Sequence, residues 1–392
     1  MSGSAFAVTH HAFSSGAGRT SDGNGSHAST LKSPSYTKSV SWQHYPFASL
    51  PMLSSKIPAN LLNTQAVDVF IMLSGFVIFF MMDNKPQSYG KYLTQRFFRI
   101  FPIYLLALIV SFVLIDFTTS VLTHALAAPA TNRRLEIINQ FNKAPSLHAF
   151  FHLLLIQGAV PVSMLKDSSY TILGQAWSVS VEWQFYIIAP LLFMLMNKIS
   201  SKKNCLTLFI ILIFMIGYGK ITDKGFYGNN LFAFSIGYLT FYFYKNIYPS
   251  INLAQLKIAS AIAIFLSIIL LGKDAFPVII WVASFYAVLK KDMCGELSFL
   301  GKVLDWRPVL YIGRISYSIY MVHMVIAFCI LSLLSGYNEL PLYMYAVFPV
   351  SCIVVSIAIS SLTYRYIEKP MMSFGKRISG KRVLPPEMNN PA

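Results

Sequence analysis

Apolar residues occur in runs of about 15 to 22 along most of this chain, separated by short polar or basic segments. A helix rises about 1.5 Å per residue, so about 20 apolar residues cross the hydrocarbon core of a bilayer. The pattern predicts membrane-spanning helices. Nine runs fit: Thr64–Met82, Ile100–Phe117, Val179–Met196, Cys205–Gly219, Phe226–Tyr244, Leu256–Leu271, Ala275–Leu289, Ile315–Leu334 and Pro341–Leu362.

Two further segments are apolar but shorter than a full span. Leu147–Pro161 is expected to lie at the membrane interface or to re-enter, and Met1–Phe13 is expected to be the end of a helix whose start is missing. Counting Met1–Phe13 as a span makes the loops alternate, with 20 Lys and Arg in 92 residues on one side and 11 in 126 on the other. The positive-inside rule assigns the more basic side to the cytoplasm. We expect about ten helices with both termini cytoplasmic.

The segments between the runs define the expected organisation of this all-α, polytopic chain. Residues 1–13 are the remnant of a first transmembrane helix, and residues 14–63, rich in Ser, Gly, Thr and Asn, form an extracytoplasmic loop. Residues 64–370 form the membrane bundle, within which the long outer loop 118–178 can fold over the mouth as a lid. Residues 371–392 form a basic cytoplasmic tail.

Composition supports this class of protein. Of 392 residues, 55% are hydrophobic and only 12% are charged, about half the usual share of a soluble domain. The net charge of +16 comes from basic residues at the ends of apolar runs, which argues against a nucleic-acid partner. The four cysteines form no CxxC pair, so no redox or metal role is expected for them.

Two acidic residues lie inside predicted spans, Asp68 and Glu182, each near the outer end. A charge in the hydrocarbon core costs about 2.5–3.5 kcal/mol on insertion scales, so such residues are functional candidates. Both could instead be interfacial residues paired with a cation or an amide. The aromatic neighbours of Glu182, among them Trp177 and Tyr186, favour a functional role for it.

Histidines form the second group of candidates. His10 and His11 are adjacent, and a neutral imidazole is the commonest general base near pH 7, although paired histidines also mark helix ends at an interface. His323 lies inside a span and could be an ordinary hydrogen-bonded histidine. His148 and His152 share a helical face, but no HExxH arrangement accompanies them, so we expect no metal site.

Arg96 and Arg99 lie one helical turn apart on the predicted cytoplasmic side. Two guanidinium groups at this spacing can hold a phosphate or pyrophosphate. The alternative is that they only anchor a helix end at the cytoplasmic face.

Five sequence blocks, in order, resemble the signature of the acyltransferase-3 family of integral membrane acyltransferases. They are Gln65–Phe76 (QAVDVFIMLSGF), Arg96–Tyr104 (RFFRIFPIY), Trp177–Tyr186 (WSVSVEWQFY), Gly313–His323 (GRISYSIYMVH) and Tyr364–Pro370 (YRYIEKP). The resemblance extends from about residue 64 to residue 370.

This resemblance implies a bundle of about ten helices in the bacterial inner membrane. It implies that the chain carries an acyl group, usually acetyl from acetyl-CoA, to hydroxyls of a cell-envelope glycan or a lipid-linked saccharide. The family's first helix carries an Arg and, further on, a His. Here His10 or His11 matches that His, and the Arg would fall at or before Met1. Either the N-terminus is truncated or this member has lost the Arg.

The resemblance also implies roles for named residues. His10 or His11 would activate the acceptor hydroxyl, and Arg96 and Arg99 would hold the phosphates of the donor. Glu182 or Asp68 would orient the imidazolium, which is an inference from the residues. Further residues are expected along the substrate path: Trp177, Tyr186, Ser74, Tyr317 and His323.

Other interpretations stay open at this point. A transporter or flippase would show repeats and paired midplane charges, which are not evident here. A catalytically inactive homologue is conceivable because of the missing Arg. The acceptor could belong to lipopolysaccharide O-antigen, capsule, peptidoglycan or an exopolysaccharide, and the sequence names neither the acyl chain nor the oligomeric state.

Overall fold

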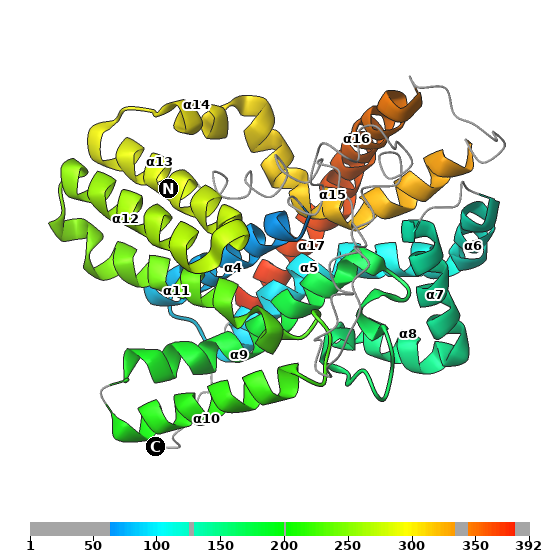
Figure 1. Cartoon of the computed structure of the whole chain (residues 1–392), viewed down its shortest axis with the longest axis horizontal. Coiled ribbons are helices and arrows are strands. Elements are labelled where there is room, and N and C mark those ends of the chain that lie inside the picture. Colours follow the sequence, from blue (N-terminus) through cyan, green and yellow to red (C-terminus); the bar gives the residue numbers. More distant parts are fainter. Residues whose placement is uncertain (1–62, 125–128, 200, 334–343, 381–392) are drawn as a thin grey trace, which may run out of the picture.

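The computed structural model describes residues 63–124, 129–199, 201–333 and 344–380, and within these ranges the regular elements are all helices (Figure 1). The all-α fold is therefore confirmed. Elements carry the labels of Figure 1. The predictions for residues 1–13, for the loop 14–63 and for most of the tail lie outside the described residues.

Each predicted span falls largely within a long helix of the described chain. These helices are α4 (Asn63–Asn84), α5 (Tyr89–Val113), α9 (Trp177–Asn197), α10 (Lys202–Gly219), α11 (Leu231–Asn246), α12 (Leu253–Leu271), α13 (Phe276–Cys294), α15 (Arg307–Ser332) and α16 (Met344–Thr363).

Seven helical stretches of the described chain are long and apolar enough to cross a membrane. One of them, Leu253–Cys294, has 42 residues, about twice the length that a bilayer requires. Gly272 has a φ of +56° at its middle, a conformation open to glycine, and this turns the chain so that α12 packs against α13. The chain is a multi-pass membrane protein.

Helix α4 lies at the centre of the bundle and packs against α9, α11 and α13 (Figure 1). Its contact with α11 is close because two glycines face each other. A Cβ on Gly237 would lie 2.4 Å from the backbone oxygen of Met72 and 3.0 Å from the Cα of Gly75. Small residues of this kind allow membrane helices to approach at backbone distance.

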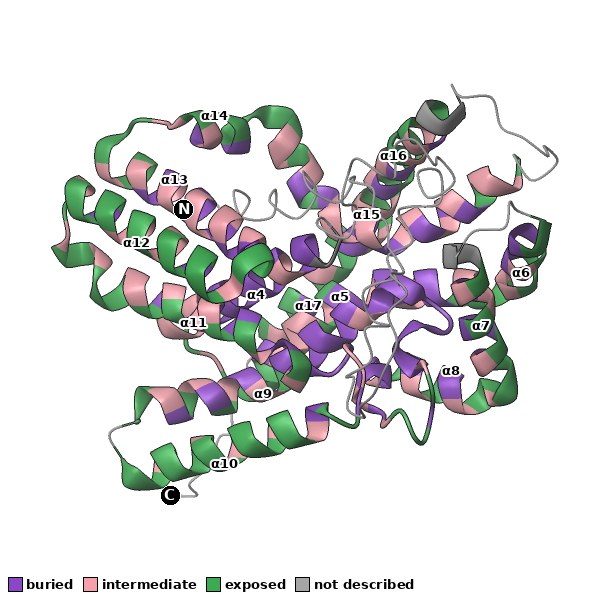
Figure 2. Cartoon of the chain, viewed as in Figure 1, coloured by how far each residue is buried: buried purple, intermediate pink, exposed green. Residues whose placement is uncertain are grey.

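Burial falls from the centre of the bundle to its edge. Much of α4 and α9 is buried, whereas α10 and α12 are largely exposed (Figure 2). Their exposed side chains are mostly large and apolar, including Phe209, Ile213 and Leu270. A lipid environment accepts such a surface, because hydrocarbon tails are as apolar as these side chains.

The second predicted span was placed wrongly at both ends. The helix α5 begins at Tyr89, eleven residues before the predicted start, and ends at Val113; after Leu114 the shorter helix α6 (Ile115–His124) begins. The charges of Arg96 and Arg99 made the first turns resemble a cytoplasmic loop. These turns are instead helical and pack against α17 (Lys369–Gly380), where Gly375 gives room to the ring of Phe98.

The long loop 118–178 folds into short helices: most of α6, then α7 (Pro129–Lys143), α8 (Pro145–Leu153) and three short 3₁₀ turns at Gln157–Ala159, Ser168–Tyr170 and Gly174–Ala176. We call the described part of residues 115–176 the cap. The nine residues of α8 are too few to span a bilayer.

The cap lies at one end of the molecule, at the right in Figure 1. The connections between α11 and α12 and between α13 and α14 (Phe299–Asp305) lie at the opposite end. Both connections were predicted to be cytoplasmic, and the cap was predicted to be outside. These two connections and the cap therefore lie at opposite ends of the described chain.

Candidate active site

Glu182 lies at the centre of a polar cluster inside the bundle. It sits on α9, only 5% exposed, and its Oε1 accepts a hydrogen bond from the hydroxyl of Tyr186, one turn along the same helix. The Ser74 hydroxyl of α4 donates to the same oxygen at 3.4 Å. Thus Ser74 and Tyr186, both predicted site residues, donate hydrogen bonds to the Glu182 carboxyl group.

The two arginines of α5 reach this cluster from the neighbouring helix. Arg96 lies over the ring of Tyr186, with 5.6 Å from the guanidinium carbon to the ring centroid, and its Nη2 lies 2.9 Å from Met81 Sδ. Arg99 has the carboxyl groups of Glu182 and Glu368 within electrostatic reach. Its own side chain is exposed although both glutamates are buried, so the cluster is open at Arg99.

The other side of the cluster comes from α15 and from the π-helical turn Tyr364–Glu368 that follows α16. Ser318 donates to Oε2 of Glu368 at 2.7 Å, and the Tyr317 hydroxyl donates to the backbone oxygen of Ile100 at 2.7 Å. We call the set Ser74, Arg96, Arg99, Glu182, Tyr186, Ser318 and Glu368 the motif cluster. Its two arginines and two glutamates balance in charge when all are ionised.

Asp68 lies outside the motif cluster. It is half-buried, and the charged residues within electrostatic reach of it are Lys224 and Asp274. The ammonium group of Lys224 lies 5.0 Å from the ring centroid of Trp177. Asp68 precedes Ser74 by six residues, about 9 Å along a helix. The structure therefore separates the two predicted acidic candidates, Glu182 in the cluster and Asp68 near Trp177 and Lys224.

His323 and its neighbours connect α15 to the start of α9. The Nδ1 of His323 donates to the backbone oxygen of Tyr320 at 2.8 Å, in the tautomer that this bond requires. The hydroxyl of Tyr320 lies 2.7 Å from Ser178 Oγ and 2.8 Å from the backbone oxygen of Gln175. The His323 bond is of the ordinary structural kind that the sequence left open.

His10 and His11 lie outside the described residues. Among the described residues, no group of three or more His, Cys, Asp or Glu is placed to hold a metal ion. His148 and His152 are buried in the cap and share Thr171 as a hydrogen-bonding partner, at 3.2 and 3.1 Å. Burial lowers the pKa of both, that of His152 to about 3, so both imidazoles are neutral at physiological pH.

The sequence as a whole matches the model of one protein family, described as an acyltransferase domain, over residues 21–365. The chain belongs to the acyltransferase-3 family. The family resemblance seen in the five blocks is confirmed. Four of the blocks contribute residues of the motif cluster from the helices α4, α5, α9 and α15. The fifth supplies Glu368.

Individual relatives of this family member are distant. The chain is 22% identical over 372 residues to YrhL of Bacillus subtilis, to which a peptidoglycan O-acetyltransferase activity is ascribed; the match covers 86% of this chain and 55% of YrhL. It is 24% identical over 235 residues to the O-acetyltransferase OatA of Staphylococcus aureus, covering 52% of this chain and 36% of OatA. The chain thus spans about half the length of YrhL and about a third of the length of OatA. No solved structure matches it.

Two site residues of this acyltransferase-3 protein were missed as candidates. Glu368 belongs to a motif that was recognised, but it follows the last predicted span, and nothing in the sequence showed that the π-helical turn Tyr364–Glu368 buries its side chain. Ser318 looked like one of several hydroxyls in the GRISYSIYMVH block. Only the packing of α15 against the π-helical turn shows that Ser318 faces Glu368.

Proposed function

We propose that this protein transfers an acyl group, acetyl in the first instance, from acyl-CoA to a hydroxyl of a cell-envelope glycan. The observation that carries the proposal is the motif cluster: four helices and the turn after α16 bring the family's polar residues together in the interior of a membrane bundle. The relatives' activity makes peptidoglycan the first acceptor to test, and lipopolysaccharide the second.

The reaction joins the acceptor oxygen to the acyl carbon and breaks the thioester C–S bond. An alcohol is a poor nucleophile until a base removes its proton, and general-base help contributes about 10²–10⁴-fold. In this proposal the base is His10 or His11. The proton taken from the hydroxyl passes to the imidazole and then to the CoA thiolate that leaves.

Glu182 is the better placed of the two acidic candidates to orient that imidazolium. Its second oxygen, Oε2, accepts no hydrogen bond from the described residues, while Oε1 accepts from Tyr186 and Ser74. A carboxylate held on one oxygen keeps the other free to accept from an imidazole N–H. Asp68, next to Lys224 and Trp177, would act on the acceptor path instead.

The arginines differ in what they can do for the donor. Arg99 is exposed and can meet an incoming phosphate, whereas Arg96 is half-buried and occupied by Met81 and two tyrosine rings. We therefore assign direct phosphate contact to Arg99 and a supporting charge to Arg96. The inner membrane is the compartment in which cytoplasmic acyl-CoA and an outward-facing glycan meet across one bundle.

The remaining predicted residues would shape the substrate path. Trp177 offers an aromatic face near Lys224, and Tyr317 fixes α15 to α5 through Ile100. The bond from His323 Nδ1 to the backbone oxygen of Tyr320 fixes the orientation of the imidazole ring, with Nε2 as its basic nitrogen.

The test uses purified full chain in lipid nanodiscs, supplied with acetyl-CoA and a short N-acetylglucosamine oligosaccharide. Release of free CoA thiol that depends on the sugar, together with a sugar product heavier by one acetyl group, supports the proposal. Thioester cleavage that never depends on any glycan acceptor, with no acetylated product, contradicts it. Envelope glycans from cells with and without the gene supply the same mass comparison in vivo.

A further inference from the structure

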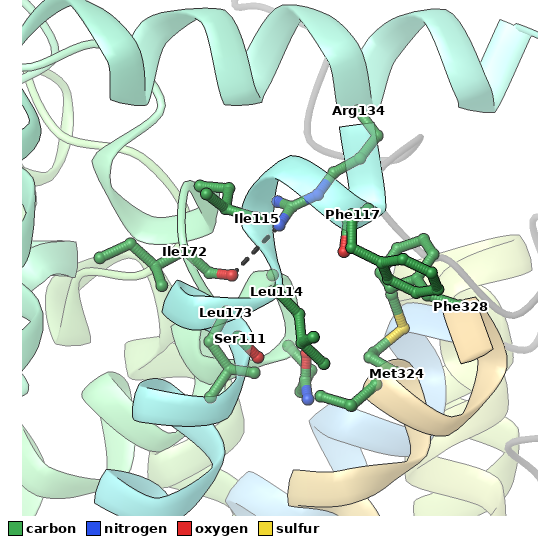
Figure 3. A pocket seen from close by; sticks show the side chains of 13 residues that line it. Ser111, Leu114, Ile115, Phe117, Arg134, Ile172, Leu173, Met324 and Phe328 are labelled. Carbon is green, nitrogen blue, oxygen red and sulfur yellow. Dashed lines mark hydrogen bonds between the residues drawn. The ribbon is translucent and has the colours of Figure 1, made fainter. Parts of the chain in front are cut away.

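Helix α5 is covered at its two ends by different elements. At the end near Leu114 the cap closes over it, and the space left between the cap, α5 and α15 has room for about one water molecule (Figure 3). Near the other end α17 lies against α5. A Cβ on Gly375 would lie 2.6 Å from the Cβ of Phe98, and Gln95 Nε2 donates to Ser379 Oγ at 3.0 Å. The rest of α17 is mostly exposed.

The exposed part of α17 has an apolar side. Met371, Phe374 and Ile378 follow one another at spacings of three and four residues, which places them on one side of the helix. They are exposed by 37%, 46% and 47%. The ring of Phe374 also meets the ring of Phe98 edge to face, with 5.3 Å between the centroids, so this side adjoins the contact with α5. We call Met371, Phe374 and Ile378 the apolar stripe.

The charges of α17 lie away from the apolar stripe. At 3.6 residues per turn, Lys369 and Lys376 project from the opposite side of the helix and Arg377 lies between the two sides. All three are exposed, and the helix contains no acidic residue. None of them forms an ion pair within the described chain, whereas two exposed lysines of other helices pair with aspartates at 2.6 and 2.9 Å. An anion outside the described chain would supply the counter-charge.

The exposed apolar surface of α16 continues along the chain into α17. Helix α16 exposes Ile359 and Leu362, and Tyr366 of the π-helical turn is 65% exposed before the apolar stripe begins at Met371. Tyrosine is enriched where a membrane helix reaches the water interface. A helix with an apolar side and a basic side lies in the plane of that interface, with its apolar side in the acyl region and its cations among the headgroups.

We propose that α17 docks on anionic phospholipid headgroups of the leaflet on the side predicted to be cytoplasmic. The apolar stripe enters the acyl region, and Lys369, Lys376 and Arg377 contact headgroup phosphates. The negative potential of an anionic leaflet attracts basic segments next to a membrane span. Since α17 begins directly after Glu368, docking also fixes the turn that carries this residue of the motif cluster. The inference does not rest on the proposed function, because it involves neither donor nor acceptor.

The first experiment measures how α17 is oriented in the membrane. The four native cysteines of the full chain are replaced by serine, and a bimane fluorophore is attached to Ile378→Cys or, as the matched control two residues away, to Lys376→Cys. The protein is placed in vesicles of phosphatidylglycerol and phosphatidylcholine that contain a lipid spin-labelled on its acyl chain. We expect this lipid to quench the label at position 378 at least about twice as strongly as the label at position 376, because only the apolar stripe faces the acyl chains. Iodide in the water should quench the two labels in the reverse order.

The second experiment measures the preference for an anionic headgroup. Native mass spectrometry of the full chain, released from nanodiscs with equal amounts of the two phospholipids, gives the ratio of bound phosphatidylglycerol to bound phosphatidylcholine. In the triple variant Lys369→Gln, Lys376→Gln and Arg377→Gln we expect this ratio to fall about fivefold, the value of one cation near an anionic surface. The control removes three exposed lysines from segments predicted to be outside, and should keep the ratio: Lys143→Gln, Lys220→Gln and Lys273→Gln.

The outcomes separate this inference from the proposed function. Equal quenching at positions 376 and 378 overturns the interfacial orientation, and an unchanged lipid ratio in the α17 triple variant overturns the headgroup contact. Binding of free CoA that the triple variant abolishes, in a protein without a preference for phosphatidylglycerol, assigns the cations to a soluble phosphate and overturns the lipid. A preference lost only in the α17 triple variant supports the inference, whether or not the protein acetylates a glycan.

Discussion

The motif cluster and the cap both bury polar side chains, but they satisfy them in different ways. In the motif cluster, side chains from α4, α5, α9, α15 and the turn after α16 face one another, with charges on both sides. In the cap, Arg134 donates to two backbone oxygens, and His152 bonds one backbone oxygen and Thr171. All of these partners lie fewer than 40 residues further along the chain. The bonds of Arg134 and His152 lie within the cap, although Gln175 and Ser169 also tie the cap to α15 and to Asp223, whereas the motif cluster depends on the whole bundle.

The difference assigns different tasks to the two regions. A charge-balanced cluster in a membrane interior is expensive to assemble, and membrane proteins keep such residues mainly for function. Backbone-bound polar groups, by contrast, fix the shape of a segment without needing another charge. Changes in the motif cluster should therefore alter chemistry first, and changes in the cap should alter local stability first.

The largest effect is expected from Glu182→Gln. The amide keeps the bonds from Tyr186 and Ser74 but loses the negative charge, so the imidazolium and Arg99 lose a counter-charge. We expect acetyl transfer to fall about 10²-fold or more. The control is Glu296→Gln, an exposed carboxylate paired loosely with Lys290 at 3.5 Å, which should keep full activity. Equal activity in the two variants would remove Glu182 from the mechanism.

In the cap, Arg134→Met should act on stability. It removes the donors to the backbone oxygens of Tyr170 and Ile172 and should destabilise the cap by about 3 kcal/mol. Hydrogen exchange of residues 129–176 measures this directly. Lys143→Met changes an exposed lysine at the end of α7 and should leave exchange unaltered. Faster exchange spread over α4 and α9 as well would show that the cap is not a local unit.

A substitution at the contact of α4 with α11 tests how strictly the bundle places Ser74. Gly237→Ala would put a Cβ 2.4 Å from the backbone oxygen of Met72, so the helices must separate, at a cost of about 1–3 kcal/mol. Thermal unfolding in detergent measures the loss. Gly217→Ala, where nothing lies within 4 Å of the new Cβ, should be neutral or stabilising. Similar melting temperatures for the two variants would refute the close contact.

The effect that needs no change at pH 7 is a pH dependence of the cap. The pKa of His152 is lowered from 6.5 to about 3 by burial, so between these values the unfolded cap binds a proton that the folded cap does not. The stability from His152 is complete above pH 6.5 and falls by about 1.4 kcal/mol per pH unit below it, until about pH 3. Exchange rates of the cap from pH 7 to pH 5 measure this, with His152→Gln removing the slope.

Asp223, in the turn between α10 and α11, accepts a hydrogen bond from Ser169 of the cap, and its titration acts on stability in the opposite direction to that of His152. Burial raises the pKa of Asp223 from 3.8 to about 6, so its contribution to stability is present at low pH and is lost as the pH rises through that range. Asp223→Asn should therefore steepen the loss of stability that the cap shows on acidification. If neither variant changed the pH profile, the burial of both groups would be contradicted.

The sequence predicted the helices better than the site. Long apolar runs determine where a helix can cross a bilayer, and each of the nine predicted runs lies mainly in a helix. The start of α5 was missed because Arg96 and Arg99 interrupt its hydrophobic pattern. Those charges are tolerated there because Glu182, Glu368 and two tyrosine rings surround them, and such partners come from distant helices that local periodicity cannot reveal.

The same reasoning explains which site residues could be predicted. Glu182 stood out as a charge within an apolar run, and the family resemblance named the arginines. Asp68 stood out in the same way, but its position six residues from Ser74 placed it with Lys224 and not with Glu182. The apolar stripe of α17 was hidden in the predicted basic tail, since its three residues share a side only once the segment is known to be helical.

Helix α15 connects the two regions by a single turn: Ser318 donates to Glu368 in the motif cluster, and three residues later the backbone oxygen of Met321 accepts from Gln175 of the cap. A helical turn of this kind moves as one rigid piece, so a displacement of Ser318 also displaces the oxygen that holds Gln175. A substitution that loosens Glu368 should therefore be felt in the cap as well, through one turn of α15.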